Sequence, residues 1–322
     1  MGVMLAPHLV EPVTAGLLGA ISVDDGPTGE QLAVLQAIVT HLWQRPDIEV
    51  GVVTPVGPDV LAANAEDPRV RRLLAGLMMT LELCRHPETE SQVARVEEYA
   101  AAMAIGGEPL EVIRTWTREG AEQANADLQR FRDEKSPEED EPTIKERTRG
   151  ADRLDPELAE RIMKLGHLPK GTLGEVCFRY YAKFDLDIPG TILSPTFHNA
   201  MFVAHDLNHA ISGYAPTGEG EIALGAMEFA MNESEGTWSR FLSSLAIHEA
   251  GMSRLADFQP KESTMSRPGA ADLVGEAFER GNLCTSDFSR IDHLSMVEWP
   301  IEEVRAHFGV VPLAGPDWTL ED

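Results

Sequence analysis

Two histidines and two acidic residues stand close together in this sequence at spacings that suit a metal site. His205 and His209 are four residues apart, so a helix would place their side chains one above the other. Asp206 follows His205 directly, about 100° around the helix axis. The glycine-rich run 213–220 would break that helix, and Glu221 would open the next one. A helix–loop–helix could thus gather two imidazoles and two carboxylates, a mixture of nitrogen and oxygen ligands that zinc accepts.

The same spacing also occurs on ordinary polar helix faces, and by itself it does not choose between that interpretation and a metal site. The motif differs from the zincin pattern His-Glu-x-x-His, because Asp206 stands where the general base of a zincin would be. We therefore expect Asp206 to be a metal ligand.

Further polar residues near this motif could take part in chemistry. His198 lies seven residues before His205 and eleven before His209, so all three fall within roughly 60° of arc on a helix, and His198 could support a ligand or contact substrate. His248, followed by Glu249, could form a second metal site or a general acid/base with Glu228. In each case an ordinary structural role is the simpler expectation, namely a core histidine for His198 and a polar helix end for His248.

Composition and charge exclude several classes of protein. The chain has 322 residues, a formal net charge of −26 and 43% hydrophobic residues, enough for two domains with apolar cores. The negative charge argues against nucleic-acid binding, which requires a basic face. It also argues against docking on anionic lipid through a basic patch, whereas transient apolar contact with a membrane stays possible.

Cysteine usage and the absence of targeting signals indicate the cytoplasm. Cys84, Cys177 and Cys284 are far apart in the sequence and odd in number, which is typical of reduced thiols. The first residues lack the basic start of a signal peptide, and no apolar run reaches the ~18 residues of a membrane span. We expect a cytoplasmic protein, peripheral to the inner membrane if it handles a membrane substrate.

Periodicity predicts an all-α protein with two helical domains. The segment 132–142 is charged and bracketed by prolines, as in a solvated linker. We accordingly divide the chain into a helical domain at 1–130, a linker at 131–150 and a helical bundle at 151–322. In the bundle, Asp155 and Thr172 are expected N-caps, the latter within a capping box, and long helices are expected at about 195–213, 221–235 and 237–257.

The first domain suggests a duplication, because an apolar helix, a polar turn and an amphipathic helix occur twice, at 17–42 and 73–105. The segment 50–53 could be a short strand or a loop. These units resemble the TerB-like domain named for tellurite resistance. The resemblance implies metal binding at an acidic turn, here at Asp24, Asp25 and Glu30. An ordinary turn is the simpler reading, since His86-Pro87-Glu88 replaces a second Asp-Gly.

The second domain carries a more specific resemblance. The motif His205-Asp206-x-x-His209, eleven residues and Glu221 looks like the signature of the ubiquinone (coenzyme Q) biosynthesis protein 4 family. Supporting matches lie at 168–174, 212–214 and 299–310, so the resemblance spans nearly all of 152–312. An N-terminal helical domain is not part of the simple family plan.

This resemblance implies a buried metal, zinc or alternatively iron, held by His205, Asp206, His209 and Glu221. It also implies an apolar groove for a prenylated quinone intermediate and contacts with other quinone-biosynthesis enzymes. We further expect a homo-oligomer. Two roles are open. The chain could catalyse decarboxylation of the quinone head group, or it could be a non-catalytic scaffold that presents the intermediate to other enzymes. Zinc is redox-inert, so an oxidative step would favour iron.

A phosphohydrolase of the HD type is the less favoured alternative. Such an enzyme needs a further upstream histidine and a downstream aspartate. His167 and Asp257 stand at suitable places, but Glu221 would then have no role.

Overall fold

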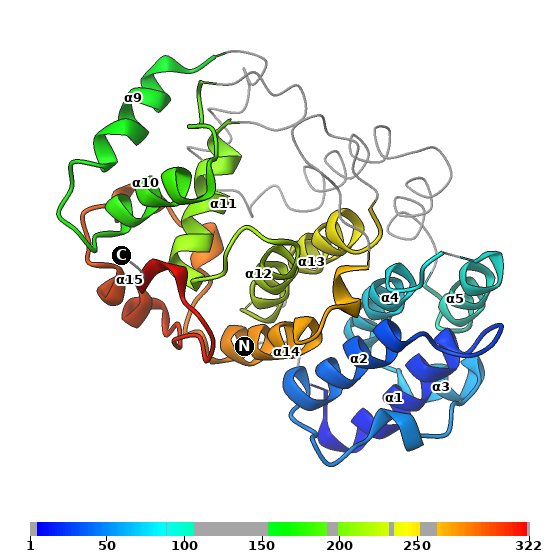
Figure 1. Cartoon of the computed structure of the whole chain (residues 1–322). Coiled ribbons are helices and arrows are strands. Elements are labelled where there is room, and N and C mark those ends of the chain that lie inside the picture. The colour runs from blue at the N-terminus through cyan, green and yellow to red at the C-terminus, as the bar shows by residue number, and fades with distance from the viewer. Residues whose placement is uncertain are drawn as a thin grey trace. The chain divides into compact units, whose positions relative to one another are not determined.

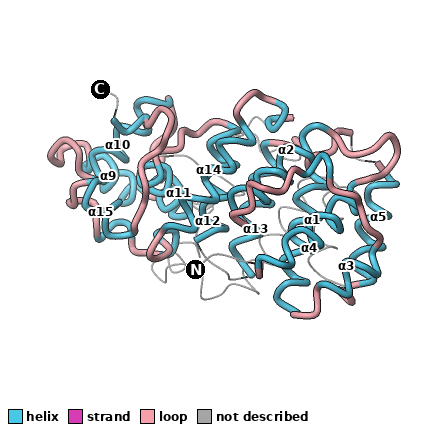
Figure 2. The backbone as a smooth tube through the Cα atoms, turned by 90° about the horizontal axis from the view of Figure 1, so that it is seen from below, coloured by secondary structure: helices cyan, strands magenta, loops and turns pink. Residues whose placement is uncertain are grey.

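The structure is a computed structural model, and it describes residues 5–87, 89–105, 154–191, 199–231, 235–251 and 263–320. Within these ranges every regular element is a helix, and Figure 2 shows helices and loops without a strand. The prediction of an all-α protein is confirmed. Among the described helices, none combines the length and the apolar character required to cross a membrane.

The chain divides into two compact units, and neither is continuous in sequence. The first contains residues 1–133 and 221–282, and the second contains residues 134–220 and 283–322. This division reflects compactness alone. The domain boundaries predicted from the charged linker, at 1–130 and 151–322, stay a prediction, and the linker itself lies outside the described residues.

Helices of the first unit come from both of its segments, and α4 packs against α13 (Figure 1). The helices are α1 (Pro7–Ile21), α2 (Gly29–Ala37), α3 (Pro58–Asn64), α4 (Pro68–Leu83), α5 (Glu90–Ala102), α12 (Gly218–Met231, from Glu221 on), α13 (Glu235–His248) and α14 (Ala270–Leu283). Shorter turns of π- or 3-10 type occur at Ile38–Leu42, Val50–Val52 and Thr264–Ser266. The segment 50–53, for which the sequence allowed either a strand or a loop, thus contains a 3-10 turn at Val50–Val52.

The two predicted repeats, α1–α2 and α4–α5, begin their second helices in the same way. Thr28 caps α2 by accepting a hydrogen bond from the backbone N–H of Gln31. Thr89 caps α5 by accepting one from the backbone N–H of Gln92. Each cap satisfies a backbone donor that the first helical turn would otherwise leave without a partner.

The glutamines of these two caps meet in the core of the first unit. The Gln31 amide donates to the side-chain oxygen of Gln92 at 3.0 Å and to the Leu81 carbonyl of α4 at 3.0 Å. The Gln92 amide donates to the Ala20 carbonyl of α1 at 2.9 Å. Both glutamine side chains are fully buried, and these bonds satisfy them there. The equivalent contacts are consistent with the duplication expected from the sequence; the TerB-like resemblance itself stays a prediction.

Helix α13 ends at His248, earlier than the predicted helix at 237–257. The N–H groups of Glu249 and Ala250 both bond to the Leu245 carbonyl, and Gly251 follows with a φ of +65°. Such a left-handed glycine is a common helix stop, because a side chain would be strained there. The segment expected to continue the helix is therefore not helical from Glu249 to Gly251.

The second unit is built from helices α9 (Pro156–Leu165), α10 (Leu173–Phe184), α11 (Asn199–Ser212) and α15 (Ile301–Phe308). Helix α10 packs against α9, α11 and α15. Further 3-10 turns lie at Phe288–Arg290, His293–Ser295 and Trp318–Leu320. The buried apolar residues that line these contacts include Leu158, Ile162, Val176, Tyr180, Leu207, Ile211, Val304 and Phe308.

The caps expected in this unit form, with one difference. Asp155 accepts a hydrogen bond from the Leu158 N–H at 2.9 Å, as predicted. Thr172 likewise accepts from the Glu175 N–H. The Glu175 carboxylate, however, bonds to the N–H of Gly171 at 3.0 Å, because the Thr172 N–H already donates to the Pro169 carbonyl. The reciprocal half of the capping box is thus shifted by one residue.

Candidate metal centre

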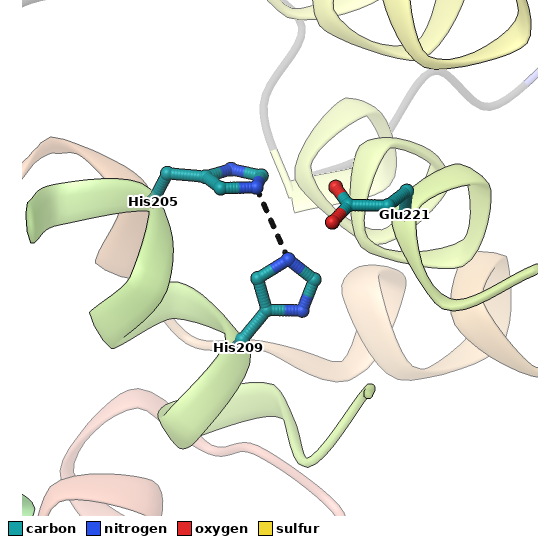
Figure 3. Close-up of side chains that lie close together, drawn as sticks. All are labelled: His205, His209 and Glu221. Carbon is teal, nitrogen blue, oxygen red and sulfur yellow. Dashed lines mark hydrogen bonds between the residues drawn. The ribbon is translucent and has the colours of Figure 1, made fainter. Parts of the chain in front are cut away.

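Three of the four predicted ligands lie together. One ligand atom from each of His205, His209 and Glu221 lies within 4.8 Å of the others. The Nε2 atoms of the two histidines are 3.1 Å apart. Figure 3 shows both rings and the carboxylate facing a common point. His209 is fully buried, Glu221 is buried, and His205 is half-buried, so the cluster is largely shielded from solvent.

A helix–loop–helix brings these residues together, as the spacing indicated. Helix α11 ends at Ser212, and Gly213 follows with a φ of +84°, a conformation that favours glycine. Helix α12 begins at Gly218, because the Thr217 hydroxyl accepts a hydrogen bond from the Gly220 N–H. The expectation that Glu221 opens this helix was wrong by three residues: Thr217 caps the helix upstream, and Glu221 stands on its first turn.

The protonation of His209 follows from its partner. Its Nδ1 atom lies 2.9 Å from the backbone carbonyl oxygen of Tyr214. A carbonyl only accepts hydrogen bonds, so Nδ1 carries the proton and donates. In the neutral ring the lone pair is then on Nε2, the atom that faces His205 and Glu221. A backbone carbonyl behind a ligating histidine is a usual way to orient the ring toward a metal.

The geometry of the donors suits a transition-metal ion. For metal–nitrogen distances of about 2.05 Å and tetrahedral angles, two imidazole nitrogens should lie about 3.3 Å apart, close to the 3.1 Å between the two Nε2 atoms. Two imidazoles and one carboxylate form the donor set of many zinc sites and of the non-haem iron centres that keep open positions. The residues present therefore fit the implied metal.

Asp206 makes a different contact. Its Oδ2 atom accepts a hydrogen bond of 2.7 Å from the hydroxyl of Tyr181 on α10, and Asp206 is not in the three-residue group. Burial, followed by the negative charge of Asp206, raises the pKa of Tyr181 well above its ordinary value, so the phenol stays a donor at neutral pH. The fourth ligand expected from the resemblance stays a prediction.

The other candidates from the sequence are placed as follows. His198 and Asp257 lie outside the described residues. His248 and Glu228 are both buried and are not in the metal group. The neighbour of His248, Glu249, is fully buried. It contacts His86 Nε2 at 2.9 Å and accepts from the Met265 N–H at 2.7 Å.

The acidic turn of the first unit makes protein contacts. The Asp24 carboxylate accepts hydrogen bonds from the hydroxyls of Thr89 and Ser91, at 2.9 Å and 2.6 Å, and lies 3.7 Å from Arg85 Nη1. These hydroxyl donors lower the pKa of Asp24. Where the structure describes the chain, Asp24, Asp25 and Glu30 are in no group that could hold a metal.

The sequence analysis missed an aromatic residue beside the metal group. The ring of Tyr180 stacks on that of His209, with centroids 5.6 Å apart and planes inclined by 21°. Tyr180 and Tyr181 stand on α10, which was predicted as a helix, but no pattern in the sequence indicates that its face would meet His209. The role of the Tyr214 carbonyl could not be predicted from residue type, since every residue has a backbone carbonyl.

Comparison with known proteins adds little. The chain matches no protein-family model and no curated protein. Among solved structures, it is similar to a protein from Nostoc punctiforme that is provisionally assigned to ubiquinone biosynthesis. The match covers 76% of this chain and 99% of the other, with 15% identity and a TM-score of 0.33. A TM-score this low does not establish a shared fold.

Proposed function

We propose that this chain is a metal-dependent enzyme of prenyl-quinone biosynthesis that holds zinc with His205, His209 and Glu221. The observation that carries this proposal is the convergence of the three ligand atoms, combined with the Nδ1–H of His209 bonded to the Tyr214 carbonyl. That bond leaves the Nε2 lone pair directed at the other two ligands, which is the protonation state that metal binding requires.

Three protein ligands favour catalysis over a purely structural site. A structural zinc is usually held by four protein ligands, whereas a catalytic zinc keeps a position for water or substrate. A zinc ion with such a position can polarise a phenolate or carboxylate oxygen as a Lewis acid. The chain's own contribution is to hold His209 rigidly and to keep the cluster largely buried, which strengthens electrostatic interactions with a bound head group.

The substrate class comes from the sequence motif and not from the geometry. The resemblance of 152–312 to the ubiquinone (coenzyme Q) biosynthesis protein 4 family supports a prenylated phenol or quinone as ligand and decarboxylation of its head group as the reaction. An oxidative decarboxylation would need iron, for which two histidines and one carboxylate are also a suitable donor set.

The test of this proposal is metal content together with turnover. We expect about one zinc per chain in the natively purified protein and none in His209→Ala, with exposed His8→Ala as the matched control that retains zinc. Stoichiometric iron would support the oxidative reaction. A well-folded wild-type protein without stoichiometric metal, even after zinc is supplied, would refute the proposal.

The second candidate, a lipid-binding scaffold, is favoured only by the apolar substrate that the motif implies. The two roles differ in what His209→Ala would do. An enzyme should lose release of carbon dioxide from a prenylated hydroxybenzoate, while a scaffold should keep its function if the folded variant still binds that lipid. Binding of the lipid without turnover by the zinc-loaded wild-type protein would favour the scaffold.

A further inference from the structure

The residues behind His209 connect it to a short turn far along the chain, Asp317 to Leu320, which we call the 317–320 turn. The Tyr214 carbonyl that accepts from His209 Nδ1 also accepts from Trp318 Nε1, at 3.1 Å. A carbonyl oxygen has two lone pairs, so both are engaged, one by the candidate ligand and one by the turn. Trp318 is buried.

Trp318 reaches His209 by a second route, through stacked rings. Its ring packs against Tyr180 at a centroid distance of 5.3 Å, and Tyr180 also stacks on His209. Phe184 closes the cluster at 5.5 Å from Trp318. The imidazole of His209 is therefore held in its plane by Tyr180, whose position depends in turn on Trp318.

A buried ion pair anchors the 317–320 turn to the end of α11. Arg305 Nη1 lies 2.9 Å from Asp317 Oδ2, with both side chains buried. The same guanidinium donates to the carbonyls of Ile211 and Ala210, at 2.9 Å and 3.2 Å. These carbonyls belong to the last turn of the helix that carries both histidines, where no intrahelical donor remains for them.

Close packing at the helix end leaves the turn little freedom. Gly213 has a φ of +84°, and a Cβ atom added there would lie 2.9 Å from the Asp317 carboxylate. Asp317 also accepts from the N–H of Thr319 at 2.9 Å. Displacing the turn would therefore disturb both the carbonyl and the ring stack that hold His209.

We propose that the 317–320 turn is a positioning device for the metal centre: its docking and metal binding at His209 favour each other, and Trp318 is the positioning residue that couples them. This inference rests on the proposed metal function. Coupling of this kind is reciprocal, so a turn that strengthens metal binding must itself be protected by the metal, by the same factor. Loss of a group bonded directly to a ligating side chain usually weakens metal binding by about 10- to 100-fold, and Trp318 acts one contact further out, through the Tyr214 carbonyl and the Tyr180 ring.

The experiment compares zinc affinity in full-length variants by competition with a chelator. We expect Trp318→Leu, which removes the ring and the N–H donor, to bind zinc about tenfold more weakly than wild type, at the lower end of the loss for a direct outer partner. Trp318→Phe restores the ring and should recover part of this loss. The matched control is Trp299→Leu, since Trp299 is 41% exposed and should leave zinc affinity unchanged.

Hydrogen exchange in the wild-type protein measures the reciprocal effect, namely how metal binding stabilises the 317–320 turn. The amides of Thr319 and Leu320 are bonded within the turn, so their exchange reports its local opening. We expect zinc to slow their exchange in the wild-type protein.

Nitrogen NMR of the zinc-free protein measures the tautomer of His209. The wild-type protein should show the proton on Nδ1. Trp318→Leu should show a mixture of both tautomers, which a loss of stability alone would not produce.

The possible results distinguish failure of the proposed coupling from failure of the proposed metal function. A wild-type protein that binds no zinc would overturn both. Tight zinc binding by the wild type, with equal affinity in Trp318→Leu and no protection of the Thr319 and Leu320 amides, would overturn the coupling alone. If Trp318→Leu does not fold, the exchange measurement and Trp318→Phe still decide the question.

Discussion

The Tyr181 hydroxyl donates a 2.7 Å hydrogen bond to Asp206 Oδ2, so the acidic residue between the two histidines is engaged with helix α10. On α11, Asp206 is rotated by about 100° from His205, and this rotation directs it toward a different neighbour. Asp206 and Glu221, which the sequence motif predicts to be equivalent ligands, therefore have different partners.

Exchanging these carboxylates for amides should therefore have unequal effects on metal binding. We expect Glu221→Gln to weaken zinc binding at least about tenfold, because an amide lacks the charge of the carboxylate ligand. Asp206→Asn should stay within about tenfold of wild type, since Asp206 is outside the three-residue group and the asparagine oxygen can still accept from the Tyr181 hydroxyl. Zinc affinity by chelator competition decides the matter. An equal loss in both variants would make Asp206 the fourth ligand that the resemblance predicts.

Stability should fall in mildly alkaline solution because buried thiols resist ionisation. Burial, followed by the charge of Asp206, raises the pKa of the Cys177 thiol, and burial raises that of Cys84. Above the unfolded thiol pKa of about 8.5 the unfolded chain releases a proton that the folded chain retains. Below that pH the two thiols leave the free energy of unfolding unchanged. Above that pH, each thiol lowers the free energy of unfolding by about 1.4 kcal/mol per pH unit, until the pH reaches the pKa of the thiol in the folded chain.

Urea unfolding between pH 7.5 and 10 measures this slope. Cys177→Ala should reduce the slope by the contribution of one proton, whatever it does to stability at neutral pH. Cys284→Ala is the control, because that thiol is only partly buried. An identical slope in Cys177→Ala and wild type would show that the Cys177 thiol ionises equally in both states.

Gly19→Ala should destabilise the first unit, although helix propensity alone predicts the opposite. Alanine is favoured over glycine within a helix by about 1 kcal/mol. A Cβ atom at Gly19, however, would meet the Tyr99 hydroxyl and the Val56 carbonyl, which are bonded to each other. Forcing them apart should lower the free energy of unfolding by about 1–3 kcal/mol.

Urea unfolding of this variant beside Gly29→Ala makes the comparison. An added Cβ at Gly29 meets nothing within 4 Å, so that variant should be neutral or slightly stabilised. Gain of stability in Gly19→Ala would mean that α1 shifts freely against the Tyr99 side chain, contrary to the packing described above.

Local interactions in the sequence were sufficient to predict the helical class and the two histidines of the metal site. Apolar periodicity and the caps at Asp155 and Thr172 act over a few residues, so they can be read without tertiary information. The spacing of His205 and His209 likewise places both rings on one face of any helix that contains them. These features determined the all-α fold and the pair of imidazoles.

Tertiary packing decided what each polar group of the site contacts. The direction of Asp206 depends on the placement of α10, which brings Tyr181 against it. The tautomer of His209 depends on a carbonyl that any residue at position 214 would supply, and Trp318 shares that carbonyl although it is more than a hundred residues away. Contacts over such separations depend on how helices pack, which a local pattern does not encode.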